Sequence, residues 1–511
     1  MRNSLTILLF LLFGTPLFPD APTRPNVLFI AIDDLRNFVN CFGYEQVLTP
    51  NIDRLAERGT IFTNAHNQAP MCGPSRASVM TGIMPYNSGA YGFVNWRKVP
   101  VLQAATTLNA HFKNNGYHTM SGGKIYHGND GSEEWDEVYC KAQHKGGTWG
   151  EEAMKPGDLA LKSYGGMKRN GPVDLPDEAF HDTLTASMAV ERLQREYDKP
   201  WFLAVGFTKP HLAWIAPRKY FDLYDPAKLE MPVVLEEDVA DTPHAAQFPS
   251  YRVEALTIDQ EEGAARRLLH AYLATITYMD AQVGRVLDAL EQRDDADNTV
   301  IILWSDHGWH LGEKQCWKKF TLWDEATRNP LLISAPEMRE KQVCTKPVQL
   351  ADMYPTLVDL CGLPAPESQL DGRSLVPLLK EPKEDWPWPA ITCNGRDSYS
   401  LTFEHWKYNR FFDGSEELYD HVNDPLEHTN LAGLPEYSGK KAAFAKFLPR
   451  KSHPNVSDGK EWILWRQDYA PLEEWNAATK ALYRELAETG RVNRKAFSNR
   501  IRAALGAREA N

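Results

Sequence analysis

Asn26-Val27-Leu28-Phe29-Ile30-Ala31-Ile32-Asp33-Asp34 is the stretch of sequence that decides the fold. Its unbroken apolar run predicts a central strand of a parallel sheet, because both faces of such a strand are covered by other layers. Two adjacent aspartates cannot both point inward along one straight strand, since successive side chains face opposite sides. We therefore expect the chain to turn at Asp33 and Asp34, as a loop around an ion would.

Two later apolar runs end in polar residues in the same way. Residues 201–206 lead into Lys209-Pro210-His211, and residues 299–304 lead into Ser305-Asp306-His307-Gly308. Residues 264–290 carry apolar side chains at the spacing of an amphipathic helix. Strands that alternate with helices predict an α/β fold, in which helices sandwich a large mixed, mostly parallel sheet. Ligands gather beyond the carboxyl ends of such strands, so we expect the three polar ends to converge.

The N-terminus has the pattern of an export signal. One positive charge in Met1-Arg2 precedes an apolar run over residues 5–13 and the breaker Gly14-Thr15-Pro16. This order predicts a signal peptide over residues 1–23. The apolar run is too short to span a bilayer, so we expect no stable membrane insertion. The expected location is secreted or periplasmic, or a lysosomal-type lumen if the source is eukaryotic.

Trp386-Pro387-Trp388-Pro389 predicts a linker into a smaller subdomain. We therefore expect the main domain over residues 24–385. A C-terminal α+β subdomain with a helical tail is then expected over residues 386–511. Residues 417–420 are predicted to form a strand of that subdomain.

Charge and cysteine content limit the possible functions. The chain has 511 residues and a formal net charge of -12, which gives no general attraction for nucleic acid. Any anionic substrate must then be bound by individually placed Arg and Lys side chains. The seven cysteines match no zinc-binding spacing and are either small core residues or the partners of at most one or two disulfides.

Met71-Cys72-Gly73-Pro74-Ser75-Arg76 carries the strongest chemical signal in the chain. Pro74 and Ser75 favour the first turn of a helix, and Thr81-Gly82 closes it. Cys72 would face the helix N-terminus, which favours anions, and Arg76 would offer a planar fork of donors to a tetrahedral oxyanion. The residues alone leave open a free buried thiol and an ordinary nucleophilic cysteine.

The pattern Cys-x-Pro-Ser-Arg followed by Thr-Gly resembles the signature of type I sulfatases, in which this cysteine is oxidised to formylglycine. Within that family the chain is most similar to iduronate-2-sulfatase-like enzymes, and the resemblance covers residues 24 to about 435. It implies an alkaline-phosphatase-like fold with the catalytic domain over residues 24–385. The supporting motifs are Asp-Asp-Leu-Arg at 33–36, Gly-Lys-Ile-Tyr-His at 123–127, Ala-Val-Gly-Phe-Thr-Lys-Pro-His at 204–211, Asp-His-Gly-Trp-His-Leu-Gly-Glu at 306–313 and Leu-Asp-Gly-Arg-Ser-Leu at 370–375.

The resemblance implies a divalent metal at the converging strand ends. Its ligands would be Asp33, Asp34, Cys72, Asp306 and His307. Carboxylate oxygens suit a hard cation, and we expect Ca²⁺ in preference to Mg²⁺. Many sulfatases carry an Asn where this chain has His307, and a histidine nitrogen is a less usual calcium ligand.

The resemblance also implies a mechanism. Formylglycine at position 72 hydrates to a geminal diol, whose one hydroxyl attacks sulfur and whose second hydroxyl later expels sulfate. Arg76, Lys124 and Lys319 would neutralise the charge of the sulfuryl group, although Lys318 competes with Lys319 for that role. His211 would protonate the leaving alcohol, and His127 would hydrogen-bond the diol.

Other functions remain open from the sequence. A phosphomonoester or phosphodiester hydrolase of the same superfamily would use a related site, and a non-catalytic protein that binds sulfated glycans would leave Cys72 unmodified. The expected partners are a sulfated carbohydrate substrate and a formylglycine-generating enzyme. The resemblance suggests a 2-O-sulfated uronic acid. Trp96-Arg97-Lys98, Trp214 and Trp309 are either a pocket for a carboxylated ring or ordinary core and surface residues.

Overall fold

The computed structural model describes residues 24–456, apart from residues 129–130, 142–161, 165–166, 244, 248–254, 256–257 and 259–260. Its centre is one large sheet in which β1 (Asn26–Asp33) lies between β10 (Thr299–Ser305) and β8 (Trp201–Pro210). Both neighbours run parallel to β1. The apolar run that starts the chain's described part is therefore a central strand, as predicted.

The whole sheet is mixed and mostly parallel. Its order is β15 (Gln342–Cys344), β2 (Thr60–Phe62), β14 (Leu331–Ser334), β10, β1, β8, β4 (His118–Gly123) and β5 (Glu137–Lys141). Only β14 runs antiparallel to both of its neighbours, β10 and β2, and all other pairs are parallel. The α/β fold class predicted from the sequence is confirmed.

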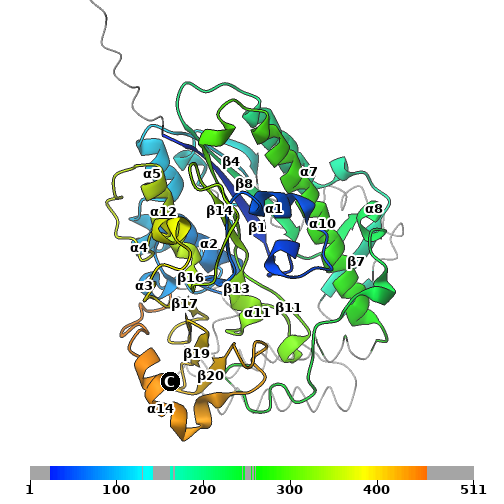
Figure 1. The fold of residues 1–511 in the computed structure, drawn as a ribbon, viewed down its shortest axis with the longest axis vertical. Coiled ribbons are helices and arrows are strands. Elements are labelled where there is room, and N and C mark those ends of the chain that lie inside the picture. Colours follow the sequence, from blue (N-terminus) through cyan, green and yellow to red (C-terminus); the bar gives the residue numbers. More distant parts are fainter. Residues whose placement is uncertain are drawn as a thin grey trace, which may run out of the picture.

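Helices cover both faces of the sheet (Figure 1). One face packs on α1 (Pro50–Ala56), α7 (His181–Leu193) and α10 (Ala264–Glu291), and the other packs on α2 (Cys72–Thr81), α5 (Leu108–Asn114) and α12 (Met353–Leu360). Along β1 the side chains alternate between the two cores, with Ile30 in the first and Phe29 in the second. This double burial explains why β1 is apolar at every interior position.

A separate four-stranded antiparallel sheet lies below the large one in Figure 1. It consists of β17 (Ala390–Cys393), β18 (Tyr399–Phe403), β19 (Trp406–Arg410) and β20 (Glu416–Asp420), and it packs on α14 (Ser438–Phe444) around a core of its own. The predicted α+β character of this region is confirmed. The division at residue 386 stays a prediction, and the signal peptide and the helical tail lie outside the described residues.

The remaining elements are short and connect these layers. A three-stranded sheet is formed by β13 (Arg328–Asn329), β3 (Ala65–His66) and β16 (Val348–Gln349), a second by β6 (Lys162–Tyr164), β7 (Met167–Val173) and β9 (Ile215–Pro217), and a hairpin by β11 (His310–Leu311) and β12 (Trp317–Lys318). The short helices are α3 (Pro85–Ser88), α4 (Pro100–Gln103), α8 (Arg218–Phe221), α11 (Asp324–Thr327) and α13 (Val376–Lys380).

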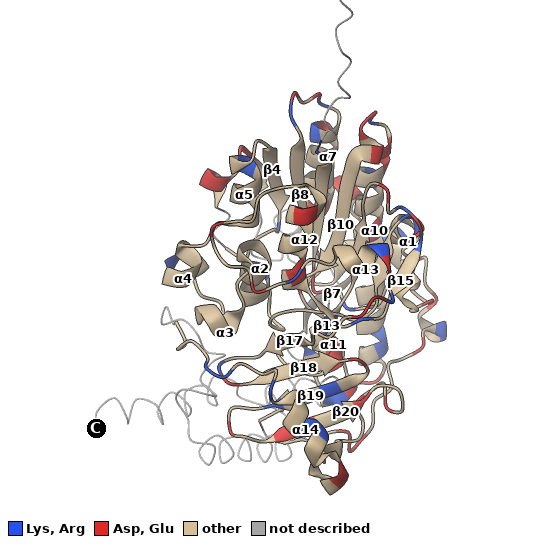
Figure 2. Ribbon diagram, turned by 60° about the vertical axis from the view of Figure 1, so that its left-hand side comes forward, with Lys and Arg blue, Asp and Glu red and all other residues tan. Residues whose placement is uncertain are grey.

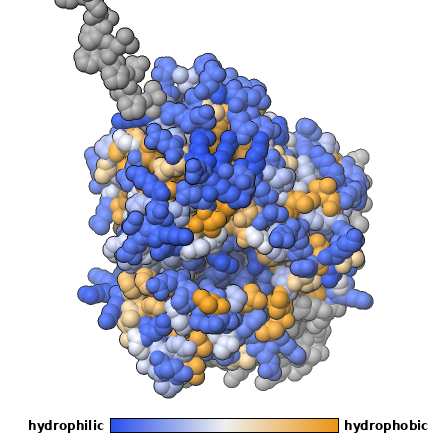
Figure 3. All heavy atoms as spheres, viewed as in Figure 1, coloured by the Kyte–Doolittle hydropathy of each residue, from blue (hydrophilic) through white to orange (hydrophobic). Residues whose placement is uncertain are grey.

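The surface carries charges of both signs, interspersed along the outer helices and loops (Figure 2). The face drawn in Figure 3 is mostly hydrophilic, and its apolar side chains form separate patches. Among the described helices, none combines the length and the apolar character needed to cross a bilayer. All seven cysteines lie in the described residues, and none of them forms a disulfide there.

Candidate active site

The chain turns sharply where β1 ends. The pairing of β1 with β8 shifts between Ile32 and Asp33, and Asp34 adopts a left-handed backbone with φ of 63°. The hydroxyl of Tyr272 on α10 donates to the backbone oxygen of Asp34 at 2.8 Å and so holds the turn. The turn predicted from the two adjacent aspartates is confirmed, and it lets both carboxylates face the same space.

The end of β4 delivers Lys124. Gly123 has φ of +72°, and a Cβ atom there would collide with the backbone oxygen of Gly206 on β8. This close approach requires glycine, and it brings the following residue to the strand end. The ammonium of Lys124 donates to the carboxylate of Asp33. Burial alone raises the pKa of Asp33, but Lys124 and other nearby cations hold that pKa well below its usual value.

The end of β10 delivers Asp306 and His307, which are both fully buried. The backbone N–H of Asp34 donates to Oδ1 of Asp306 at 3.2 Å, so the loops after β1 and β10 are joined. On α2, the hydroxyl of Ser75 donates to the backbone oxygen of Asp306 at 2.6 Å. The sequence places Ser75 in the first turn of the helix but does not predict this contact, and it gives no signal for Tyr272, whose side chain resembles any other apolar-face residue of α10.

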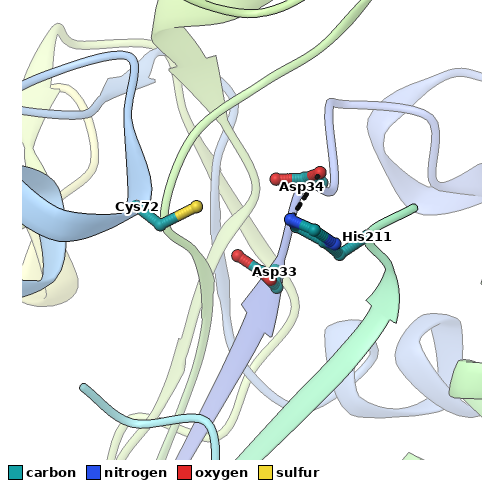
Figure 4. A group of neighbouring side chains, drawn as sticks. All are labelled: Asp33, Asp34, Cys72 and His211. Atoms are coloured by element: carbon teal, nitrogen blue, oxygen red, sulfur yellow. Dashed lines mark ion pairs between the residues drawn. The ribbon is translucent and has the colours of Figure 1, made fainter. Parts of the chain in front are cut away.

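Cys72 is the first residue of α2 and is 1% exposed. Its sulfur lies 3.1 Å from Nε2 of His307 and 3.1 Å from Nζ of Lys319. In Figure 4 the sulfur points toward the carboxylates of Asp33 and Asp34, which extend from the end of β1. The three polar strand ends and the helix N-terminus therefore converge on Cys72.

These side chains have the composition of a cation site. One ligand atom from each of Asp33, Cys72, Asp306 and His307 lies within 4.8 Å of every other, and the same holds for the group formed by Asp33, Asp34, Cys72 and His211. Oδ1 of Asp33 and Oδ2 of Asp34 are buried and have no hydrogen-bond partner. Buried carboxylate oxygens require compensation, and a hard divalent cation provides it. The residues present therefore fit a divalent metal.

His307 is set up as a neutral ligand. Its Nδ1 lies 3.0 Å from the backbone oxygen of Gly308, and a hydrogen bond there leaves the lone pair of Nε2 facing the cluster. Burial and then the charge of Lys319 lower the pKa of His307 to about 3. The imidazole is therefore uncharged at neutral pH and able to bind a cation.

Contrary to what the sequence suggested, Arg76 does not present its guanidinium to the open site. It is 0% exposed, and its Nε donates to Oδ2 of Asp306 at 2.7 Å. Its remaining nitrogens donate to the backbone oxygens of Ile32, Lys124 and Ile125, and one of them lies 3.5 Å from Asp33. Because these protein acceptors occupy the guanidinium, Arg76 orients the carboxylates from behind. The sequence predicted that Arg76 would offer its donors to an oxyanion, and in the structure those donors bind protein oxygens instead.

Lys319, not Lys318, reaches the cluster. Its ammonium lies 2.6 Å from Oδ1 of Asp34 and 3.2 Å from Nε2 of His307. Lys318 pairs with His310 in the hairpin of β11 and β12. Burial alone lowers the pKa of Lys319, but Asp34 and then Cys72 hold that pKa well above its usual value, so the ammonium stays charged.

The two candidate proton carriers lie at different depths. Nε2 of His211, beyond β8, lies 3.9 Å from Oδ2 of Asp34, and the side chain is 30% exposed (Figure 4). Its position between the buried cluster and solvent suits a group that meets the leaving part of a substrate. His127 is half-buried and packs on Phe93 at a centroid distance of 4.7 Å, and Phe93 lies against Gly73. His127 therefore stands at the rim of the site.

The tryptophans considered as a sugar pocket belong to the core. Trp214 and Trp309 are 0% and 2% exposed and pack edge to face at 5.8 Å. Trp96 is buried and stacks on Tyr126. Arg97 forms an ion pair with Glu134 at 2.5 Å. Of the two readings that the sequence left open, the structure supports core packing.

Comparison with known proteins identifies the architecture around this site. The family described as Sulfatase matches residues 25–363, and a second family, described as N-sulphoglucosamine sulphohydrolase, C-terminal, matches residues 312–452. The chain belongs to the sulfatase family. This sulfatase is therefore a sulfuric ester hydrolase, as the motif around Cys72 predicted.

Named relatives agree with this assignment. A sulfatase of Formosa agariphila is 34% identical over 442 residues, which are 84% of this chain and 87% of the relative. The iduronate 2-sulfatase of Homo sapiens is 32% identical over 395 residues, which are 67% of this chain and 70% of the relative. The phosphonate monoester hydrolase of Silicibacter pomeroyi has a similar solved structure, with a TM-score of 0.68 and 24% identity over 83% of this chain and 94% of the other. At that identity the likeness concerns the fold alone.

Proposed function

We propose that this sulfatase removes sulfate from a sulfated glycan by means of a formylglycine derived from Cys72 and a divalent cation, Ca²⁺ in preference to Mg²⁺. The observation that carries the proposal is the convergence of Cys72, three buried aspartates, His307 and Lys319 at one edge of the sheet. A formylglycine-generating enzyme would be the partner in maturation. The predicted signal peptide supports a secreted or periplasmic location, or a lysosomal-type lumen.

The buried thiol supports a modified nucleophile. Burial and then the charge of Asp33 raise the pKa of Cys72 in the unmodified chain, which disfavours the thiolate that an ordinary cysteine nucleophile needs. Formylglycine, once hydrated, supplies a hydroxyl for attack on sulfur and a second hydroxyl that permits the release of sulfate. Asp33, Asp34, Asp306 and His307 would hold the cation, which would supply positive charge near the ester oxygens and lower the pKa of the attacking hydroxyl.

Four side chains have the remaining catalytic roles, which are charge neutralisation, orientation of the metal ligands and proton donation. Lys319, which stays charged, neutralises the negative charge that grows on the sulfuryl oxygens. Lys124 holds the pKa of Asp33 low and orients its carboxylate, and Arg76 orients the carboxylate of Asp306. His211 donates a proton to the oxygen of the departing alcohol at the outer edge of the cluster.

The proposed substrate is a sulfated sugar. The similarity to iduronate 2-sulfatase supports a 2-O-sulfated uronic acid or a similar sugar as the substrate. We propose exo action on that sugar as part of the same hypothesis. A sugar alcohol is a strongly basic leaving group, so a proton donor such as His211, whose side chain is partly exposed, suits it.

Two measurements test the proposal. Mass spectrometry of the peptide that contains Cys72 should detect formylglycine, which is lighter than cysteine, in the active protein. A panel of defined sulfated oligosaccharides, analysed by NMR for the position that loses sulfate, should then identify the sugar. Faster turnover of aryl phosphate than of aryl sulfate would favour a phosphoester hydrolase, and glycan binding without turnover would favour a non-catalytic role.

A further inference from the structure

The loop that carries Lys319 has an unusual backbone. Gly312 and four nearby non-glycine residues have positive φ, with values of 54° at Lys314, 51° at Gln315, 77° at Lys318 and 74° at Phe320. Side chains with a Cβ atom rarely adopt this conformation, and it persists only where surrounding contacts impose it. The position of Lys319 in the cluster therefore depends on what anchors residues 312–320.

Lys314 anchors this loop from a deeply buried position. Its side chain is 1% exposed, and its ammonium donates to Oδ1 of Asp238 at 2.8 Å and to the backbone oxygen of Glu427. The backbone N–H of Lys314 also donates to Oδ2 of Asp238 at 3.2 Å. A buried carboxylate thus binds both ends of the same lysine, and this fixes a left-handed backbone that the sequence does not favour.

The two residues that accept these hydrogen bonds are both buried. Asp238 is 3% exposed. Glu427 follows β20 in the C-terminal part of the chain, and its carboxylate accepts from the backbone N–H of Asp324 at 3.0 Å and pairs with His421 at 3.0 Å. The ammonium of Lys314 therefore ties the loop of Lys319 to the C-terminal antiparallel sheet region.

We propose that Lys314 is a positioning residue for catalysis, which acts through Lys319 by imposing the conformation of residues 312–320. The expected effect on kcat/KM rests on the proposed function. The expected effect on the conformation of residues 312–320 rests on the geometry alone. In the described hydrogen bonds and ion pairs, Lys314 contacts neither Cys72 nor the active-site aspartates Asp33, Asp34 and Asp306, so its influence must pass through the loop.

The test compares Lys314→Met with a matched control, Lys407→Met. Lys407 is also buried, at 0% exposure, and pairs with Asp324 at 3.2 Å and with Glu427 at 3.5 Å, but it lies on β19 and makes no such contact with the loop. Both substitutions remove one ammonium from the same junction and should lower the thermal midpoint similarly. Lys314→Arg, which keeps the charge, is the conservative variant for rescue.

We expect a large loss of activity from Lys314→Met and only a small one from Lys407→Met. On an aryl sulfate at a temperature where all variants are folded, Lys314→Met should lower kcat/KM by about 100-fold, the order expected for misplacement of a catalytic group by roughly 1 Å. Lys407→Met should lower it by less than about 3-fold, and Lys314→Arg should recover part of the loss. In an enzyme that already carries Lys319→Ala, adding Lys314→Met should lower kcat/KM by less than about 3-fold, because the ammonium that Lys314 positions is absent.

Hydrogen exchange followed by mass spectrometry gives a readout that needs no activity. Lys314→Met should increase amide exchange in residues 315–320, and Lys407→Met should not. Equal losses of activity in the two variants, or multiplicative losses of Lys314→Met and Lys319→Ala, would overturn the proposal, as would unchanged exchange in residues 315–320. A wild-type enzyme without turnover of any sulfate ester would count against the proposed function, and the exchange experiment would still decide the role of Lys314.

Discussion

The side-chain nitrogen of Lys319 lies 3.1 Å from the sulfur of Cys72. The two residues are separated by 247 positions in the chain, and they meet because α2 and the hairpin of β11 and β12 lie at the same edge of the sheet. A permanent positive charge beside the nucleophile position can act on the transferred group in every turnover.

Substitution at position 72 should separate the two halves of the reaction. Cys72→Ala should lower kcat at least about 1000-fold, because no nucleophile remains. Cys72→Ser should give at most one slow turnover that ends in sulfated enzyme, since serine lacks the second hydroxyl needed to expel sulfate. Intact-protein mass spectrometry after incubation with an aryl sulfate measures this adduct. Wild-type turnover by Cys72→Ser would refute the formylglycine mechanism.

Metal removal should abolish activity and lower stability together. Chelation leaves Oδ1 of Asp33 and Oδ2 of Asp34 buried without a hydrogen-bond partner. Ca²⁺ at a hundredfold excess over its Kd should stabilise the fold by about 3 kcal/mol. Calorimetry with and without Ca²⁺ measures this, and reconstitution with Mg²⁺ tests the choice of ion. The control Asp306→Asn should weaken the calcium effect. Full activity in a metal-free preparation would contradict the prediction.

His211→Ala should discriminate between leaving groups. A sugar alcohol needs a proton as its bond to sulfur breaks, whereas nitrophenolate leaves without help, so the loss should be at least about 10-fold larger on a sugar sulfate than on nitrophenyl sulfate. Lys319→Ala is the matched comparison and should slow both substrates similarly, because it acts on the sulfuryl group. If both variants show the same ratio of losses, His211 is not the acid that protonates the leaving group.

Protonation of His421 should stabilise the C-terminal sheet region below neutral pH. Burial alone lowers the pKa of His421, but its hydrogen bond to Glu427 and the charge of Asp324 outweigh burial and raise the pKa above 6.5. A raised pKa in the folded state gives stability that is complete below the unfolded pKa and is lost as pH rises through the folded pKa.

The free energy of unfolding should therefore differ more between wild type and His421→Gln at about pH 5.5 than at about pH 9. Chemical denaturation at both pH values measures the difference, and His118→Gln, outside this network, serves as the control. An equal difference at the two pH values would show that His421 contributes through packing alone.

Much of this site could be predicted from the sequence, because its parts sit at ends of apolar runs. β1, β8 and β10 are buried on both faces, so their polar termini stand out locally, and a parallel sheet brings such termini together. The glycine before Lys124 likewise marks a close approach of two strands. Each of these signals spans only a few residues, and each has a direct physical cause.

Partners at long range could not be predicted. Arg76 carries the right chemistry for an oxyanion, but only the fold shows that Asp306 and three backbone oxygens occupy its donors. Lys314 and Glu427 are separated by 113 positions, and each alone resembles an ordinary surface charge. Burial of a lysine is decided by its carboxylate and carbonyl partners, which no local periodicity encodes.

The pairing of β1 has a consequence for how the chain is made. Its two neighbours, β8 and β10, begin 175 and 273 residues after Asn26, so the first described strand of the large sheet has exposed edges until late in synthesis. A chain cut before residue 299 would keep Asp33, Asp34 and Cys72 but leave one edge of β1 unpaired. Unpaired edges of an apolar strand promote aggregation, so we expect such truncations to be recovered as insoluble protein rather than as weakened enzyme.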